Sequence, residues 1–417
     1  MNDIPLDSIR LGRNTPGIAQ HDAEPQIDMR RMRAYRLGRV QGELRKRDLA
    51  GVILYDPINV RYANGSSNMQ VWILHNQARY CWVPAEGPTV LFEYKTAMHL
   101  SSHLETIGEI RPCIGWTYFS ADERVGEKVA LWSKDMDDAI RQTMGAGNKR
   151  IAADHLDPAG AHEMQKLGYE IHNGQEVMEL ARSIKSPDEV ACMTIAISVC
   201  EAGMAKMHEE LRAGITENEL WSHLHQVNIA RGGEWIETRL LASGGRTNPW
   251  FRECSDRIIR AGELVAFDTD LIGPFGYCSD ISRTWFCAPG KPTDEQKRLY
   301  RYAYDQIQTN MDLMKPGMSF VEIAEKSWKI PNEFNARRYG VLAHGVGLCD
   351  EYPHIQFTDN ARDSSAGTFD PGMTICVESY IGAEDGVEGV KVEEQVLMTE
   401  NGLQRLSTYP YEDNLLN

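Results

Sequence analysis

Two segments in the second half of the chain, Gly214–Leu220 (GITENEL) and Gly317–Ile323 (GMSFVEI), repeat one pattern. In each segment a glycine ends one helix, and a serine or threonine with glutamate three residues later begins the next as a capping box. Each segment precedes a strand pair with acidic residues, within 265–285 and within 373–398. Two such helix-and-hairpin units that face each other would place four acidic positions in one central cleft. Two unrelated capping boxes would produce the same sequence pattern, so both a repeat and a coincidence are compatible with it.

The first half of the chain has a different pattern, in which helices alternate with short apolar strands. A basic amphipathic helix from about Arg30 to Lys46 precedes an apolar strand at Ala50–Tyr55, and a further strand is predicted at Thr89–Tyr94. This alternation predicts an α/β layer. Near residue 185 the pattern changes, because the segment Ser186–Glu189 (SPDE) supplies the cap, the first-turn proline and the glutamate that begin a long helix. We therefore predict two domains, residues 1–185 and 186–417.

Composition excludes several classes of protein. The 417 residues carry a formal net charge of -16, which disfavours nucleic acids and anionic membranes as partners, because both require a basic surface. The nine cysteines include no CxxC pair, which indicates neither a disulfide framework nor a zinc finger. No window of about eighteen apolar residues occurs, and the first residues (MNDIPLDSIRLGRNTPG) are too polar for a signal peptide. We therefore expect a cytoplasmic protein with no nucleic-acid or membrane partner.

Four segments of the second half combine apolar strands with acidic residues or histidine. They are FDTD (267–270), CSDISRT (278–284), HGVG (344–347), and Glu378 together with VKVEE (390–394). Because the flanking strands are apolar, the carboxylates at their ends point into a largely buried place, where they are costly unless paired or bound to metal. Several carboxylates with one histidine form a hard, oxygen-rich set that suits Fe(II), Mn(II), Co(II) or Zn(II). The pattern therefore predicts a catalytic centre with two bridged metal ions.

These motifs resemble those of the pita-bread peptidases, the family of methionine aminopeptidase, aminopeptidase P, prolidase and creatinase. The resemblance runs through nearly the whole chain and rests on IKSPDEV (184–190), GYCSDISRT (276–284), HGVG and VKVEEQ (390–395). It implies an α/β N-terminal domain and an α+β pita-bread C-terminal domain with an internal pseudo-twofold repeat. It also implies a homodimer in which the N-terminal domain covers the partner's cleft. The family's five metal ligands fall on Asp268, Asp280, His344, Glu378 and Glu393. The alternative is a metal-free relative used as a binding module.

Three departures from the peptidase pattern bear on the reaction. Asp270 stands where the peptidases carry glycine, and we expect it to be a sixth metal ligand rather than a solvated or salt-bridged side chain. Trp250 and Asp350 stand where those enzymes carry two histidines that bind the peptide and move protons. Amide cleavage requires a general acid, because an unprotonated amide anion is too basic to leave. An Xaa-Pro dipeptidase or related aminopeptidase-like metallohydrolase therefore becomes the alternative function.

A sulfonium ion leaves as a neutral sulfide without a general acid, and Trp250 or Tyr339 could hold its positive charge by cation–π attraction. With Asp270 and Asp350 included, the sequence resembles the DddP-type dimethylsulfoniopropionate (DMSP) lyases, which release dimethyl sulfide and acrylate. The resemblance implies two divalent metal ions, with iron favoured over manganese, cobalt or zinc, and removal of the substrate's α-proton by Asp350. Burial or a neighbouring carboxylate such as Glu351 should raise the pKa of this base. Tyr339 is expected either to be a catalytic residue that also contacts the substrate or to be an aromatic residue of the core.

Overall fold

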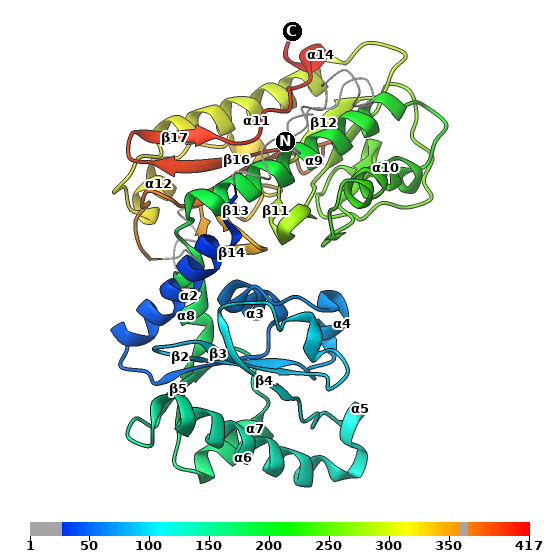
Figure 1. Cartoon of the computed structure of the whole chain (residues 1–417). Helices are drawn as coiled ribbons and strands as arrows, with labels where there is room; N and C mark the ends of the chain where they lie inside the picture. Colours follow the sequence, from blue (N-terminus) through cyan, green and yellow to red (C-terminus); the bar gives the residue numbers. More distant parts are fainter. Residues whose placement is uncertain (1–26, 358–365) are drawn as a thin grey trace, which may run out of the picture. The chain divides into compact units, whose positions relative to one another are not determined.

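The computed structural model describes residues 27–357 and 366–417 and divides the chain into two units, Asp28–Arg182 and Ser183–Asn417 (Figure 1). Residues 1–26 of the predicted N-terminal domain lie outside the described residues. Each unit has its own sheets and its own hydrophobic core.

The first unit is built on one six-stranded sheet in the order β4-β3-β2-β1-β5-β6. Its strands are β1 (Gly51–Leu54), β2 (Tyr80–Pro84), β3 (Thr89–Glu93), β4 (Ile107–Pro112), β5 (Arg150–Ala153) and β6 (Glu170–Asn173). β1, β5 and β6 run parallel, as do β3 and β4, while β2 is antiparallel to both of its neighbours. Every residue of β1, β2 and β3 is buried. Such continuous apolar runs are typical of strands that are covered on both faces.

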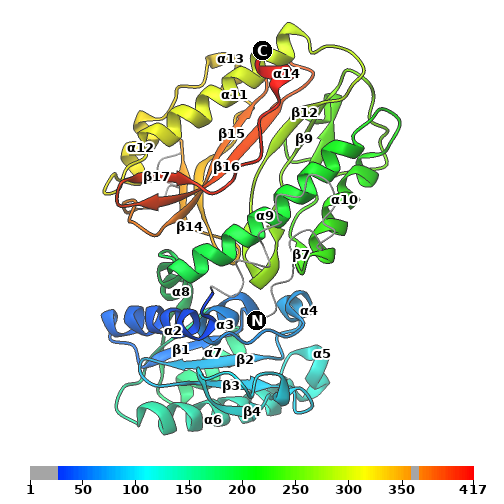
Figure 2. The same ribbon diagram turned by 45° about the horizontal axis from the view of Figure 1, so that its top comes forward.

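Helices supply that cover on both sides of the sheet. They are α2 (Met29–Lys46), α3 (Pro57–Asn64), α4 (Gln70–His75), α5 (Tyr118–Ala121), α6 (Val125–Met144), α7 (Pro158–Lys166) and α8 (Gly174–Arg182). Figure 2 shows α2 and α3 on one face of the sheet and α6 on the other. The predicted α/β layer is therefore confirmed for the described part of this unit.

The second unit begins with α9 (Pro187–Glu210), whose cap Ser186 forms both hydrogen bonds of a capping box with Glu189. Among the described helices, α9 alone is long and apolar enough to cross a membrane, but 67% of its most apolar window is buried within the protein. That degree of burial is typical of a core helix. The other helices are α10 (Glu217–Ala230), α11 (Asp294–Leu313), α12 (Phe320–Lys326), α13 (Asn332–Asn335) and α14 (Asp413–Leu416).

Two halves of this unit repeat one arrangement, in which a helix pair is followed by antiparallel strands. In the first half, α9 and α10 precede β7 (Trp235–Ile236), β8 (Leu241–Ser243), β9 (Leu264–Phe267), β10 (Leu271–Ile272), β11 (Cys278–Ser279) and β12 (Arg283–Phe286). In the second half, α11 and α12 precede β13 (Val341–Val346), β14 (Asp350–Gln356), β15 (Thr374–Ile381), β16 (Val390–Thr399) and β17 (Gly402–Arg405). The sheets have the orders β11-β10-β7, β12-β9-β8 and β14-β13-β15-β16-β17. The repeat that the two glycine-led segments indicated is therefore real.

Strands β12 and β16 form the seam between the two halves, as Figure 2 shows. The Thr284 hydroxyl donates to the Lys391 carbonyl at 2.8 Å and accepts from the Lys391 amide at 3.0 Å. The Glu393 amide also donates to the Ser282 carbonyl at 3.2 Å. Residues just before β12 and within β16 are consequently held next to each other in the interior.

Candidate metal centre

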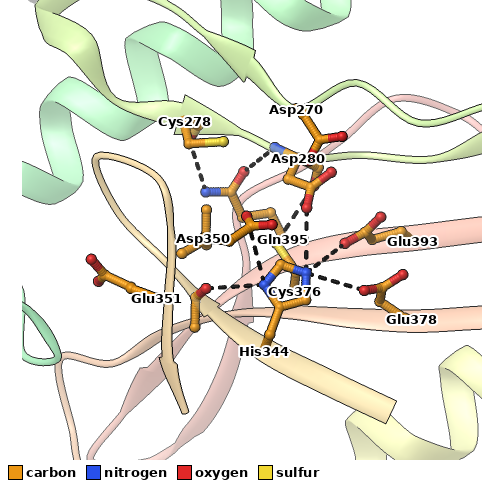
Figure 3. Close-up of polar contacts among 12 residues, drawn as sticks. Asp270, Cys278, Asp280, His344, Asp350, Glu351, Cys376, Glu378, Glu393 and Gln395 are labelled. Atoms are coloured by element: carbon orange, nitrogen blue, oxygen red, sulfur yellow. Dashed lines mark hydrogen bonds and ion pairs between the residues drawn. The ribbon is translucent and has the colours of Figure 1, made fainter. Parts of the chain in front are cut away.

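The six side chains that the sequence singled out as metal ligands lie together in the second unit, and all are buried. Asp268 directly follows β9, Asp270 precedes β10, Asp280 lies between β11 and β12, His344 is in β13, Glu378 is in β15 and Glu393 is in β16. Figure 3 shows the carboxylates of Asp280, Glu378 and Glu393 pointing at the His344 imidazole. The seam thus brings together residues that lie far apart in the sequence.

Strand register explains this convergence. Glu378 lies directly opposite Glu393, and His344 lies directly opposite Cys376. Because side chains alternate along a strand, Cys376 and Glu378 share one face of the sheet. The Nε2 atom of His344 lies 3.1 Å from Glu378 Oε1 and 3.5 Å from Glu393 Oε1. Asp280 Oδ2 approaches the same nitrogen to 3.4 Å from the first half of the unit.

The donor atoms form groups that are compact enough to hold a metal ion. Ligand atoms lie within 4.8 Å of one another in three groups: Asp280, His344, Cys376 and Glu393; Asp268, Glu378 and Glu393; and Asp268, Asp270 and Asp280. Asp280 Oδ1 and Glu393 Oε1 are buried with no hydrogen-bond partner among the described residues. A divalent cation would satisfy such oxygens, which are costly to bury alone. Because the groups share members, the residues fit two cations with common ligands.

Lys391 is a buried cation in this cluster that the sequence analysis did not single out. Its ammonium Nζ lies 3.0 Å from Asp268 Oδ2, 2.6 Å from Glu378 Oε2 and 2.9 Å from Glu393 Oε2. It also donates to the Ser282 hydroxyl at 2.7 Å. With all five carboxylates ionised and His344 neutral, as metal binding requires, one ammonium would leave four negative charges, which two divalent cations would balance. The signal was present, since a period of two along VKVEE places Lys391 on the same face as Glu393.

Burial and mutual repulsion shift the pKa values of the carboxyl groups. Burial raises the pKa of Asp268 and of Asp280 well above the ordinary value for aspartate, and neighbouring carboxylates add to the effect. Burial, with the nearby Asp350, raises the pKa of Asp270 to about 7. Burial alone would raise the pKa of Glu393 too, but the Lys391 ammonium holds it well below the usual range. Without a cation, the cluster therefore retains protons that a metal ion would displace.

Asp270 occupies a backbone position that suits glycine better than aspartate. Its φ of 36° lies in the left-handed region, which costs energy for a residue with a side chain. The Thr238 hydroxyl donates to Asp270 Oδ2 at 2.6 Å and orients the carboxylate. Strain of this kind persists where the surrounding structure over-determines it, and it is frequent at functional sites. The carboxylate in place of a peptidase glycine is thus held in a defined position inside the cluster.

Asp350 lies at the edge of the cluster and differs from the other acidic residues in its exposure. Its side chain is 53% exposed, and its Oδ1 lies 3.7 Å from His344 Nδ1. Loss of hydration raises the pKa of Asp350 above its ordinary value, and Glu393 and Glu378 raise it further, while His344 opposes them. Burial alone would lower the pKa of His344, but Asp350 and the neighbouring acidic groups raise it well above the usual value.

Burial raises the pKa of Asp350 as expected, but Glu351 is not among the main causes of the shift. Glu351 forms a buried ion pair with Lys185, so its negative charge is neutralised away from the cluster. Asp350 and Glu351 are adjacent in a strand and therefore point to opposite sides, as Figure 3 shows. The carboxylates that act on Asp350 come from β15 and β16 instead.

The two candidate aromatic residues lie close together beside the cluster. Trp250 is 6% exposed, stacks on Tyr380 with ring centroids 6.1 Å apart, and packs next to Tyr339. Tyr339 has the Lys391 ammonium 5.0 Å from its ring centroid and stacks on Phe251 at 5.3 Å. Phe251 is 63% exposed, a residue that the sequence analysis did not select. Phe251 is therefore an exposed aromatic ring in direct contact with Tyr339.

The sequence profile of metallopeptidase family M24 matches residues 191–400. The solved structure of the prolidase from Pyrococcus horikoshii superposes with a TM-score of 0.71 at 22% sequence identity, over 90% of this chain and 99% of that chain. The pita-bread fold with an α/β N-terminal domain is therefore confirmed.

Two curated proteins named dimethylsulfoniopropionate lyase DddP are more similar in sequence. The protein of Roseovarius nubinhibens is 41% identical over 395 residues, which cover 93% of this chain and 88% of the relative. The protein of Roseobacter denitrificans is 39% identical over 422 residues, which cover 99% of this chain and 94% of the relative. The chain therefore belongs to metallopeptidase family M24 and, within it, to the DddP-type lyases.

Proposed function

We propose that this protein cleaves the C–S bond of DMSP and releases dimethyl sulfide and acrylate. The two DddP relatives, similar over nearly their whole length, support this substrate. The observation that carries the mechanism is Asp350, a half-exposed carboxylate beside His344 at the edge of a buried cluster. A substrate can reach this group, and a positioned carboxylate of raised pKa is suited to act as a general base.

The cofactor in this proposal is a pair of divalent transition-metal ions, with iron favoured over manganese, cobalt or zinc. The ligands are Asp268, Asp270, Asp280, His344, Glu378 and Glu393. An oxygen-rich set of five carboxylates and one imidazole, with only the Lys391 ammonium as a buried cation among its contacts in the described residues, supports that assignment. Two bound cations would supply positive charge that stabilises the negative charge developing on a substrate carboxylate.

In the reaction, Asp350 removes the proton from the carbon next to the substrate carboxylate. The electron pair of that C–H bond forms the double bond of acrylate while the C–S bond breaks. The electron pair of the C–S bond leaves with sulfur, and the sulfonium departs as neutral dimethyl sulfide. The proton passes from Asp350 to solvent, because 53% of that side chain is exposed. A general acid is unnecessary, which agrees with Trp250 and Asp350 standing where peptidases carry histidines.

A direct assay tests the function. Protein loaded with Fe(II), Mn(II), Co(II) or Zn(II) is incubated with DMSP, and dimethyl sulfide is measured in the headspace by gas chromatography together with acrylate in solution. Equal amounts of the two products are expected. Hydrolysis of an Xaa-Pro dipeptide without release of dimethyl sulfide would instead support the metallohydrolase, and absence of bound metal would support a binding module.

Metal binding should release protons, and its affinity should fall as the pH falls through about 7. Asp270, with a pKa of about 7 before a cation binds, is partly protonated at neutral pH, and a cation binds its ionised form. Calorimetric titrations near neutral pH in buffers of different ionisation enthalpy give the number of protons released. Asp270→Asn should release fewer protons than the wild type. Equal proton release by both proteins would contradict a ligand role for Asp270.

Changes at the aromatic residues should weaken substrate binding. Trp250→Phe should keep part of the activity, and Trp250→Ala should raise KM by about five- to thirtyfold, because a desolvated cation–π contact contributes about 1–2 kcal/mol. Phe251→Ala should raise KM at little cost in stability, because that side chain is 63% exposed. Steady-state kinetics with DMSP check this. A parallel loss of metal and thermal stability in the Trp250 variants, with no preference for DMSP over a neutral isostere as ligand, would instead assign Trp250 to packing.

The proposed setting is a cytoplasmic homodimer that acts on a small sulfonium substrate without nucleic-acid or membrane partners. The formal net charge of -16 supports the absence of such partners, since both would require a basic surface. The homodimer rests on the resemblance to the prolidase and creatinase branch. Light scattering after size-exclusion chromatography tests it, and a mass of one chain would contradict it.

A further inference from the structure

Lys185 and Glu351 form a buried ion pair outside the metal cluster. The two side chains are 2% and 0% exposed. Lys185 lies in the IKSPDEV segment before α9, and its backbone amide donates to the Gly372 carbonyl at 2.9 Å. Its Nζ also lies 3.5 Å from the Ser183 carbonyl oxygen. The lysine is thus held at its backbone and at the end of its side chain. It can therefore keep the Glu351 carboxylate in a fixed position.

Glu351 follows Asp350 in β14, and the two side chains leave the strand on opposite sides. The side that holds Glu351 is tightly packed, because a Cβ at Gly347 would lie only 2.6 Å from Glu351 Oε1. A side chain at position 347 would therefore require the Glu351 carboxylate to shift from its present position. Rotation of the strand that moved Glu351 would therefore move Asp350 away from His344 Nδ1, which is now 3.7 Å from Asp350 Oδ1.

We propose that Lys185 is a positioning residue, which aims the general base Asp350 at the substrate by holding Glu351 on the opposite side of β14. The inference rests on the proposed role of Asp350. It gives a function to the IKSPDEV segment, which supplies no metal ligand. It also explains why Glu351, the residue next to the base, is paired with a buried lysine.

The test compares variants by kcat, KM, metal content and the primary isotope effect with DMSP deuterated at the α-carbon. Lys185→Met should lower kcat by about ten- to hundredfold, since small misplacements of a reacting group have effects of that size. KM and metal content should stay near wild type, and the isotope effect should rise because proton transfer becomes slower relative to other steps. Lys185→Arg should restore part of kcat.

Two controls separate positioning from stability. Lys185→Met/Glu351→Met replaces the pair by apolar side chains, which generally restores stability, but kcat should stay low because an apolar contact is not directional. Arg79→Met removes one partner of the Arg79–Glu93 ion pair in the first unit, both of whose side chains are 0% exposed. It should lower thermal stability without changing the isotope effect.

Each outcome decides the inference. Wild-type kcat and isotope effect in Lys185→Met, or full recovery of both in the double variant, would overturn the positioning role and leave the lyase function intact. Absence of dimethyl sulfide from the wild-type protein would overturn the proposed function and this inference with it. A lowered kcat with an increased isotope effect in Lys185→Met and in the double variant would support it.

Discussion

Asp350→Asn should lower the turnover of DMSP by about a hundred- to ten-thousandfold, the usual contribution of a positioned general base. Asparagine keeps the shape and most hydrogen bonds of aspartate but cannot accept the proton. Metal content and substrate affinity should stay near wild type, because the carboxylate is half exposed at the edge of the cluster and lies outside the proposed ligand set. Stopped assays of dimethyl sulfide, with metal analysis and equilibrium binding of DMSP, measure the three quantities.

Asp350→His is the matched variant for the alternative function. It rebuilds one of the two missing peptidase histidines, yet we expect no dipeptidase activity, because Trp250 still stands where the other histidine would be. Near wild-type release of dimethyl sulfide by Asp350→Asn, with metal intact, would mean that another residue is the base. Tyr339, whose ring lies beside Lys391, would then be the first candidate.

His344→Ala should remove metal and activity together. Its Nε2 lies within 3.5 Å of carboxylate oxygens from three different segments, so its imidazole is a donor at the centre of the proposed ligand set. Loss of an outer hydrogen-bond partner of a metal ligand already costs about 10- to 100-fold in affinity, and loss of the ligand itself should cost more. Elemental analysis by mass spectrometry and the headspace assay check this.

The control for this variant is His354→Ala. His354 is exposed in β14 and is the register partner of His344 in β13, so the same type of substitution is made one strand away. It should leave metal content and turnover unchanged. Full metal content with wild-type turnover in His344→Ala would remove this histidine from the site.

Much of the fold could be predicted because it depends on local pattern. The capping box at Ser186 and Glu189 fixed the start of α9, and apolar runs such as Gly51–Leu54 marked strands that are buried on both faces. The acidic residues of the cluster stood out because each follows or interrupts an apolar strand. The approach of Glu378 and Glu393 to His344 follows from the pairing of β13, β15 and β16, which the repeat made plausible in advance.

Other parts of the site depend on contacts that only the tertiary structure defines. Lys391 lies inside a motif that the sequence singled out, but its contact with Asp268 requires the seam between β12 and β16, and its contact with Glu378 requires the pairing of β15 with β16. Glu351 was named as a carboxylate that could raise the pKa of Asp350, but its ion-pair partner Lys185, 166 residues away in the chain, could not be predicted from local sequence. Phe251 has a left-handed backbone with a φ of 76°, which no local pattern of the sequence announces.

Because the candidate centre lies at the seam, bound metal ions would hold the two halves of the second unit together. Two of the three donor groups draw on both halves, so neither half could bind the pair alone. Separation of the halves would release the ions, and bound ions would in turn oppose separation by mass action. Retained metal would therefore report assembly of the unit, and two separately expressed halves should rejoin more readily when the cation is supplied.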